Sequence, residues 1–224
     1  MINVSINYCL QVIPQLKRLS LSQKDVNLIE NAQFEASLFD GVEVLCLESF
    51  LQESIAFPYH FLERFSNLDE LIVKYSSFEE ILSFQVQSVD YARECAPFKK
   101  LCLAYLDQLK TIWSDDDSQL HALQNLESLQ VECCSNLIKL TPSFASFENL
   151  KLVGLPSLKS FCSENQTLKF PELLVVIINE CDQMKMFCPG ALETPKLSDV
   201  EIEEEEIYLG VSNGESINML LEKV

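Results

Sequence analysis

Residues 126–140 read LESLQVECCSNLIKL, and this stretch decides the fold. Its first half alternates apolar and polar residues around Leu129 and Val131, and a period of two is typical of a β-strand with one buried face. Its second half has an apolar residue at every third position, at Cys134, Leu137 and Leu140, which suits an extended or 3₁₀ turn. The stretch therefore predicts a short strand followed by a turn that leads away from it.

The first half of this pattern, L-x-x-L-x-L with L for any large aliphatic residue or Phe, recurs along the chain. Its starts are Leu16, Val42, Leu68, Phe98, Leu126, Phe147, Leu173 and Leu197. Successive starts are 21 to 30 residues apart, and the period-three half follows in the four consecutive units that begin at 98, 126, 147 and 173. Stacked units of this kind align like residues into buried ladders, which form the core of a solenoid.

The repeat predicts an α/β leucine-rich-repeat solenoid, a curved horseshoe with a parallel sheet of about eight short strands on its concave face. The connections are long enough to serve as the crossovers that parallel strands need. We expect an irregular convex side with short helices at 58–65 and 119–123, and the least regular connection at 79–97. The sequence thus predicts one domain over residues 1–224, with an acidic end or cap at 203–224.

The charge and the apolar pattern narrow the class of protein. The chain has 34 acidic and 16 basic residues, a formal net charge of −18, whereas nucleic-acid binding needs clustered Lys and Arg. No apolar run reaches membrane-spanning length, and no signal peptide precedes the glycosylation sequons at Asn3 and Asn165. We therefore expect a cytoplasmic protein that binds neither nucleic acid nor membrane.

The cysteines are expected to be reduced. There are nine of them, an odd number, at spacings that fit neither a zinc site nor a small disulfide scaffold. Cys134 and Cys181 share one position of the pattern two units apart, and two rungs of a sheet separate them by roughly 9–10 Å. A disulfide needs Cα atoms within about 7 Å, so both are predicted to be core residues of a ladder.

No catalytic site is expected. The two histidines, His60 and His121, fall on predicted connections with no nucleophile that the pattern would place beside them. The run Asp115–Asp117 lacks the ligand spacing, the glycine and the terminal Glu of a calcium loop. The sequence accordingly predicts a protein that is not an enzyme and has no cofactor, metal or small-molecule substrate.

A candidate contact site lies on the predicted concave face. Period two sends the third, fifth and seventh positions of each unit to that face, and most of these residues are polar. Val153, Val175 and Ile177 interrupt the polar pattern in adjacent units, with Lys100 and Lys151 as basic positions nearby. An apolar patch rimmed by charge predicts a partner-binding site, although a strand can also simply tolerate β-branched residues on its outer face.

Several phrases resemble the repeats of plant intracellular nucleotide-binding leucine-rich-repeat disease-resistance proteins of the coiled-coil class. They are residues 57–68 (FPYHFLERFSNL), 155–162 (LPSLKSFC), 170–173 (FPEL) and 184–187 (MKMF). The resemblance implies a repeat domain that contributes to recognition of pathogen effectors and restrains a nucleotide-binding switch domain. Its partner would be an effector, a guarded host protein or that switch domain, although the five glycines form no P-loop in this chain.

Another class of protein also uses cysteine-bearing repeats of this kind. They occur in the substrate-recruiting arm of F-box ubiquitin ligases, which is the alternative function. The absence of an F-box and the Phe-Pro-x-Leu opening at 170–173 weigh against this alternative. An extracellular plant receptor is also disfavoured, because its regular Gly-x-Ile-Pro segment is missing.

Overall fold

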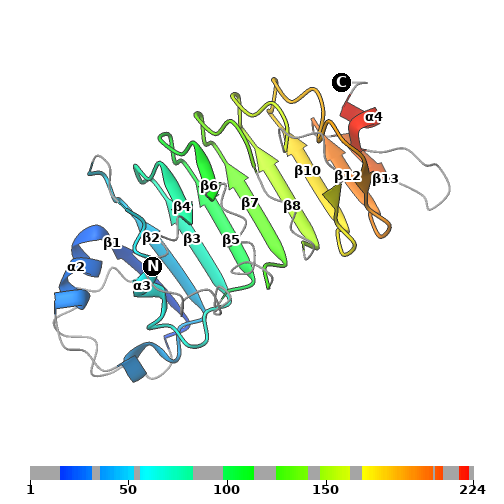
Figure 1. The fold of residues 1–224 in the computed structure, drawn as a ribbon. Helices are drawn as coiled ribbons and strands as arrows, with labels where there is room; N and C mark the ends of the chain where they lie inside the picture. Colours follow the sequence, from blue (N-terminus) through cyan, green and yellow to red (C-terminus); the bar gives the residue numbers. More distant parts are fainter. Residues whose placement is uncertain are drawn as a thin grey trace.

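The computed structural model describes residues 16–31, 36–52, 56–82, 98–113, 125–140, 147–161, 168–203, 205–208 and 217–221. Each repeat unit contributes one strand to a sheet whose order follows the chain (Figure 1). The strands are β1 (Arg18–Ser22), β2 (Val44–Glu48), β3 (Glu70–Lys74), β5 (Lys100–Ala104), β7 (Ser128–Glu132), β8 (Asn149–Val153), β10 (Val175–Asn179), β12 (Asp199–Ile202) and β13 (Glu205–Tyr208). The first eight are parallel, which confirms the predicted leucine-rich-repeat solenoid with one strand per unit.

The strands pair in the register that the repeat predicts. Leu129 of β7 lies opposite Leu101 of β5 on one side and Leu150 of β8 on the other. We number positions from the first L of each unit, so these three leucines all occupy position 4. The short step of 21 residues between β7 and β8 leaves this register unchanged, because the connection alone takes up the difference in length.

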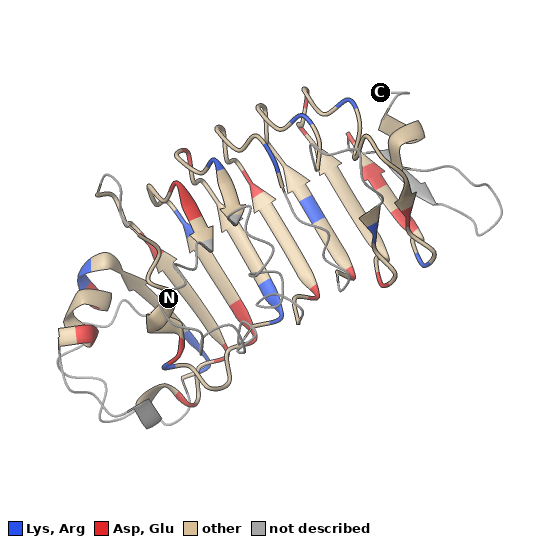
Figure 2. Ribbon diagram, in the orientation of Figure 1, with Lys and Arg blue, Asp and Glu red and all other residues tan. Residues whose placement is uncertain are grey.

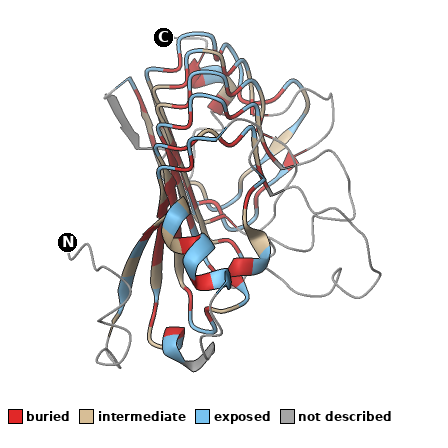
Figure 3. Cartoon of the chain, turned by 90° about the vertical axis from the view of Figure 1, so that its left-hand side faces the viewer, coloured by how far each residue is buried: buried red, intermediate tan, exposed pale blue. Residues whose placement is uncertain are grey.

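The core lies between the sheet and the connections. From β2 to β12 every residue at positions 4 and 6 is buried, and Leu129 and Leu150 are 0% and 1% exposed. The period-three residues of the four extended units are buried as well, from Leu106 to Phe187. Phe161 stacks on Phe187 with ring centroids 4.9 Å apart and meets Phe170 edge-on at 5.5 Å. Figure 3 shows this alternation of buried and accessible residues along the chain.

The described parts of the connections are mostly irregular, as predicted. Helix α3 (Tyr59–Leu62) lies inside the predicted helix 58–65 and buries Phe61 and Leu62. The predicted helix at 119–123, and residues 83–97 of the long connection, lie outside the described residues. The remaining connecting elements are α2 (Gln23–Asn31), the 3₁₀ turn η1 (Ala36–Phe39), β4 (Glu80–Leu82), β6 (Thr111–Trp113), β9 (Leu168–Lys169) and β11 (Leu192–Glu193).

Four of these elements form two further pairs away from the main sheet. Strands β4 and β6 pair in parallel, and so do β9 and β11. In these units the connection therefore contains extended segments that bond to one another from unit to unit. The prediction of an extended or 3₁₀ turn is met here by turns and extended chain, and the 3₁₀ segment at η1 precedes the period-three units.

In the main sheet, each of the strands β2, β3, β5, β7, β8 and β10 is followed directly by a residue with a left-handed backbone. This residue occupies position 8 and is Ser49, Tyr75, Tyr105, Cys133, Gly154 or Glu180, with φ between 51° and 64°. A left-handed backbone costs roughly 1–2 kcal/mol for a residue with a Cβ. The backbone N–H of Tyr105 donates to the carbonyl of Glu132 at 3.0 Å, and that of Cys133 donates to Val153 at 2.9 Å. These bonds extend the ladder past the strand and offset the strain.

The C-terminal end of the sheet is closed by a hairpin and a short helix. Strand β13 pairs antiparallel with β12 as the ninth strand of the sheet, and it contains Glu205 and Glu206 of the segment 203–224. Helix α4 (Ile217–Leu221) buries Ile217 and Leu220 beside it. Asn218 of this helix accepts the N–H of Phe187 at 2.6 Å and donates to the carbonyl of Cys188 at 2.7 Å.

Candidate functional site

The concave face carries positions 3, 5 and 7 of the units, because positions 4 and 6 point into the core. Most side chains on this face are half-buried or exposed. Cys46 and Ala104 are exceptions at 5% and 7% exposure, and Ala104 lies between the longer side chains of Lys74 and Glu132. Glu203 was expected on this face, but β12 ends at Ile202 and Glu203 lies in the following turn with φ 52°. The face is therefore a solvated surface with a few small residues covered.

The three predicted apolar residues lie together on strands β8 and β10. Ile177 pairs in register with Lys151, and Val153 pairs with Asn179. Val153, Val175 and Ile177 are each half-buried. Because Val176 and Ile178 are buried on the core side of β10, Val175 and Ile177 point to the concave face. We call Lys151, Val153, Val175 and Ile177 the β8–β10 patch.

Lys100, the fifth predicted residue, lies apart from this patch. It begins β5, and β7 and β8 separate it from β10. Its ammonium lies 2.9 Å from a carboxylate oxygen of Asp69. This hydrogen bond favours the protonated ammonium and raises the pKa of Lys100, so the positive charge of Lys100 is paired with Asp69. The structure thus brings together four of the five predicted residues.

Lys151 is held at the edge of the β8–β10 patch by an acidic neighbour. Its ammonium lies 2.7 Å from a carboxylate oxygen of Glu132 on β7. The side-chain amide of Gln130 donates to the same oxygen at 2.8 Å. Both charged groups are partly exposed, so the pair contributes at most about 1 kcal/mol to stability. Its main effect is to place a fixed dipole beside the apolar residues.

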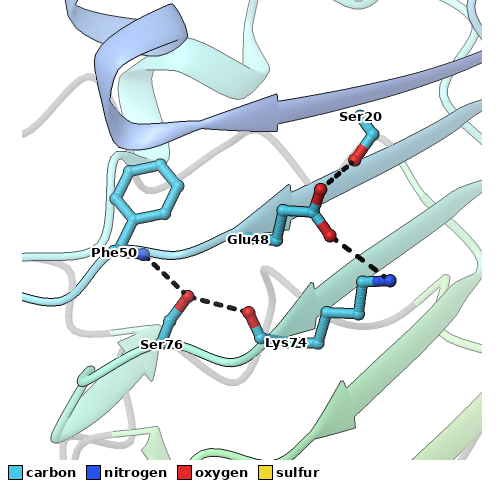
Figure 4. Close-up of polar contacts among 5 residues, drawn as sticks. All are labelled: Ser20, Glu48, Phe50, Lys74 and Ser76. Carbon is cyan, nitrogen blue, oxygen red and sulfur yellow. Dashed lines mark hydrogen bonds and ion pairs between the residues drawn. The ribbon is translucent and has the colours of Figure 1, made fainter. Parts of the chain in front are cut away.

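A second polar network spans the first three strands. Glu48 accepts a hydrogen bond from the Ser20 hydroxyl at 3.0 Å and lies 3.3 Å from the Lys74 ammonium (Figure 4). Below it the hydroxyl of Ser76 donates to the carbonyl of Lys74 and accepts the N–H of Phe50. Ser76 is buried, and these two bonds satisfy it. This end of the face is therefore polar and internally paired.

Lysines elsewhere on the surface pair with acidic residues of neighbouring units. Lys99 lies 2.7 Å from Glu127, and Lys196 lies 2.6 Å from Glu172. Figure 2 shows the charged residues lying mostly at the strand ends and in the turns. With acidic residues twice as numerous as basic ones, such pairing leaves the excess negative charge facing outward.

The described cysteines are free thiols, as the sequence predicts. They are Cys46, Cys102, Cys133, Cys134, Cys181 and Cys188. Burial raises the pKa of Cys134 to about 12 and that of Cys181 to about 11. Both are core residues whose thiols point at backbone carbonyls, Cys134 at that of Glu132 and Cys181 at that of Asn179. Thiolate is the reactive form, so these two groups are chemically inert near neutral pH.

Two tyrosines on the same side of the molecule went unnoticed in the sequence. Tyr75 and Tyr105 stack with centroids 4.8 Å apart and planes inclined by 18°. They are 51% and 47% exposed. The signal was present, because both occupy position 8 directly after a strand in adjacent units. The alternation of buried and solvent-facing residues ends at position 7, so it makes no prediction for position 8.

Groups of catalytic type are sparse in the described ranges. No cluster of three or more His, Cys, Asp or Glu side chains there could hold a metal ion. His60 lies on α3 beside Glu63, with its Nδ1 3.3 Å from the carboxylate. His121 and Asp115–Asp117 lie outside the described residues. None of the described helices is long and apolar enough to cross a membrane.

Comparison with known proteins gives one consistent family. The profile described as plant disease resistance protein RPS2-like, leucine-rich repeats, matches residues 15–146. The chain is 25% identical to probable disease resistance protein At1g61300 of Arabidopsis thaliana over 211 residues, 85% of this chain and 26% of that protein. It is 27% identical to disease resistance protein UNI of the same plant over 214 residues, 86% of this chain and 22% of that protein.

The lengths of the matched segments decide which conclusions the similarities support. The chain spans about a quarter of the length of these curated relatives. The profile covers more than half of the chain and includes the first five repeat units. The chain therefore belongs to the family of RPS2-like leucine-rich repeats of plant disease resistance proteins.

Proposed function

We propose that this chain is the protein-interaction module of a plant immune receptor and acts in the cytoplasm. In this proposal residues 1–224 form one leucine-rich-repeat domain that contributes to effector recognition and to autoinhibition. The partner is a protein, namely a pathogen effector, a guarded host protein or the nucleotide-binding domain of the receptor. The family match and the disease-resistance relatives support this reading over that of a ubiquitin-ligase arm.

The observation that carries the proposal is the β8–β10 patch. Val153, Val175 and Ile177 are half-exposed on two paired strands, although the rest of the face is mainly polar. Apolar side chains at the centre of a contact, surrounded by polar groups that exclude water, are where binding energy concentrates. The paired charges of Lys151 and Glu132 supply such a polar border on one side. A protein surface of matching shape would bury the three side chains.

The proposal includes Lys100 as a more distant contact. Lys100 is exposed on β5 and forms an ion pair with Asp69. A charged residue at the rim of an interface affects mainly the rate of association and its salt dependence. We therefore expect Lys100→Ala to slow binding of the partner slightly, with a smaller effect on affinity than changes within the β8–β10 patch.

The experiment that tests the proposal is site-specific photocrosslinking in plant cells. A photoreactive phenylalanine analogue is placed at Ile177, and at Leu28 on α2 as a control exposed on another surface. We expect a protein crosslinked from position 177 and absent from position 28. That protein, purified, should bind the unmodified chain, and Ile177→Asp should weaken binding by tenfold or more, on the scale of a contact hot spot.

The stability of the Ile177→Asp variant is the control for the binding measurement. Ile177 is half-buried on the solvent side of its strand, so Ile177→Asp should leave the melting temperature within a few degrees of the parent. Equal crosslinking from both positions, or unchanged affinity of Ile177→Asp, would contradict the proposal. If Ile177→Asp unfolds the chain, Ile177→Ser supplies the affinity measurement with a smaller perturbation.

A further inference from the structure

The stacked pair of Tyr75 and Tyr105 lies at the carboxyl edge of the concave face. Each follows the last residue of a strand, Lys74 of β3 and Ala104 of β5. The two rings stack at 4.8 Å, and each side chain stays about half exposed. Tyrosine is enriched at protein interfaces, because it combines a large apolar ring with a polar hydroxyl. The exposed half of the pair therefore offers aromatic surface for a contact.

The backbone at these positions gives no reason for a tyrosine. Tyr75 and Tyr105 have φ values of 51° and 55°, a left-handed conformation that favours glycine. The same position of the sixth unit is in fact Gly154, with φ 64°. A bulky residue here is strained, and it buries only part of its ring in return. The stack offsets part of that cost, and the property that remains is the exposed aromatic surface itself.

The neighbouring rungs leave the pair open on one side. At position 8 the side chains shrink from Tyr105 to the thiol of Cys133 and then to the hydrogen of Gly154. A Cβ on Gly154 would lie 3.3 Å from the Cys133 sulfur, so these two small residues pack closely against each other. Among the described residues, Tyr75 is the aromatic neighbour that stacks on Tyr105. Toward the next unit, the Tyr105 hydroxyl interacts with the side chain of Cys133.

The charges at this edge favour a cationic partner. At positions 7 and 8 the described charged residues are Glu48, Lys74, Glu132, Glu180 and Glu203. Lys74 already pairs with Glu48, and its ammonium lies 5.5 Å from the centroid of the Tyr75 ring. One ring of the pair is thus already engaged by a cation of the chain itself. The net charge of the edge is negative, as is that of the whole chain.

We propose that Tyr75, Tyr105, Cys133 and Gly154 form a docking edge for a protein segment that presents an arginine side chain. The guanidinium stacks on the exposed ring of Tyr105, which an aromatic face favours through its quadrupole. Guanidinium suits this position better than ammonium because it is planar and weakly hydrated. The negative charge that favours an arginine is that of the whole chain, −18, because Glu132 one strand away already pairs with Lys151. This inference rests on the proposed function, since the segment belongs to a partner protein.

The test uses a synthetic glycine-serine peptide that carries two arginines. Its control is the same peptide with citrulline, which keeps the shape of the side chain and removes its charge. The chain is labelled with ¹³C on its tyrosine rings, of which there are six. At low salt we expect the arginine peptide to shift the Tyr75 and Tyr105 ring signals saturably, and the citrulline peptide to leave them unmoved.

Substitution tests the same point with the fold held constant. Tyr105→Gly should weaken binding of the arginine peptide by about two- to fivefold, the loss expected for one cation–π contact at an exposed site. Glycine is unstrained at this left-handed position, so the melting temperature should stay close to that of the parent. The control is Ile138→Ala, which removes an exposed apolar side chain elsewhere. It should bind the peptide as the parent does.

Three outcomes would overturn the inference. They are equal shifts with the citrulline peptide, unchanged binding by Tyr105→Gly, and no saturable shift of the Tyr75 and Tyr105 signals. These results are independent of the crosslinking at Ile177. A partner captured through Ile177 with no arginine binding at Tyr105 would refute the docking edge alone. Arginine binding at Tyr105 with no partner at Ile177 would refute the proposed contact patch alone.

Discussion

Gly154 packs against Cys133 of the preceding unit, so that a Cβ on Gly154 would lie 3.3 Å from the Cys133 sulfur. Gly154 also has φ 64°, in the left-handed region. We expect Gly154→Ala to lower the free energy of unfolding by about 1–2 kcal/mol, the cost of a left-handed backbone for a residue with a Cβ. Urea unfolding of the purified chain measures this difference.

The contact with Cys133 makes a contribution to the cost of Gly154→Ala that can be measured separately from the backbone strain. In the Cys133→Ala background the sulfur is absent, so Gly154→Ala should cost less than it does in the parent. A double-mutant cycle measures the difference, which should amount to about 0.5 kcal/mol or more for residues in contact. Strict additivity of the two substitutions would show that the two side chains do not touch.

Leu129 gives the second prediction. It is fully buried in β7 and lies opposite Leu101 and Leu150. Leu129→Ala should destabilise the chain by about 2–5 kcal/mol, because it removes buried methyl groups and leaves a cavity. Leu28→Ala, at a position that is 57% exposed, is the control and should change stability little. Similar losses for the two variants in chemical denaturation would place Leu129 outside the core.

The third prediction concerns alkaline pH. Burial raises the pKa of Cys102 and Cys181 from 9.0 to about 11 and that of Cys134 to about 12. Above about pH 9 the unfolded chain loses these thiol protons first, so the folded chain binds more protons and the free energy of unfolding falls as pH rises. The buried thiols of Cys134 and Cys181 each contribute up to roughly 1.4 kcal/mol per pH unit in this window, and the half-buried Cys102 contributes less.

The measurement is urea unfolding at a series of pH values between about 8 and 10.5. Below about pH 9 the thiols are protonated in both states, and their contribution should be constant. Cys134→Ala removes one of the three groups and should make the alkaline decline less steep. A free energy of unfolding that stays level up to the top of the range would contradict the assigned burial of these thiols.

The fourth prediction concerns the cap formed by α4. Asn218 accepts the N–H groups of Phe187 and Cys188 at 2.6 and 3.2 Å. Asn218→Ala removes this acceptor from both N–H groups, at a cost of about 1–3 kcal/mol for the N–H of Phe187. Hydrogen exchange should accelerate at these two amides and stay unchanged in β7, because a repeat unit contacts only its neighbours.

Asn218→Asp is the matched variant for this cap. It keeps the acceptor for the two amides and loses the donor to the carbonyl of Cys188. We expect its exchange rates at Phe187 and Cys188 to lie between those of the parent and Asn218→Ala. Acceleration in β7 as well would show that α4 supports the whole solenoid and not its last unit.

The sheet and its core were predictable because one short pattern specifies them. A residue at position 4, such as Leu129, has the same neighbours in every unit, so its burial follows from the repeat alone. The same alternation placed Ile177 on the solvent side of its strand. Period two determines the register of a strand, which of its side chains are buried and which face of the sheet each one lies on. All three can therefore be predicted from the sequence.

The left-handed residues after the strands were not predictable in the same way. Propensity favours glycine at such a position, yet Tyr75 and Tyr105 occupy it, and hydrogen bonds to the next unit stabilise them. These bonds depend on the assembled stack. Helix α2 was missed for another reason. Its signal, Ser22 bonding to Asp25 ahead of buried Val26 and Ile29, is short and lies within a unit assigned to the repeat.

The reversal of direction at β13 has a consequence for how such arrays lengthen during evolution. A duplicated unit adds a parallel strand, and it needs a parallel neighbour with a free edge. Strand β13 occupies the edge of β12 in the opposite direction. A gene duplication can therefore add a rung between two parallel strands of the sheet, whereas addition directly after β12 would first have to displace the hairpin. Gain of repeats in this lineage is accordingly disfavoured at the junction between β12 and β13.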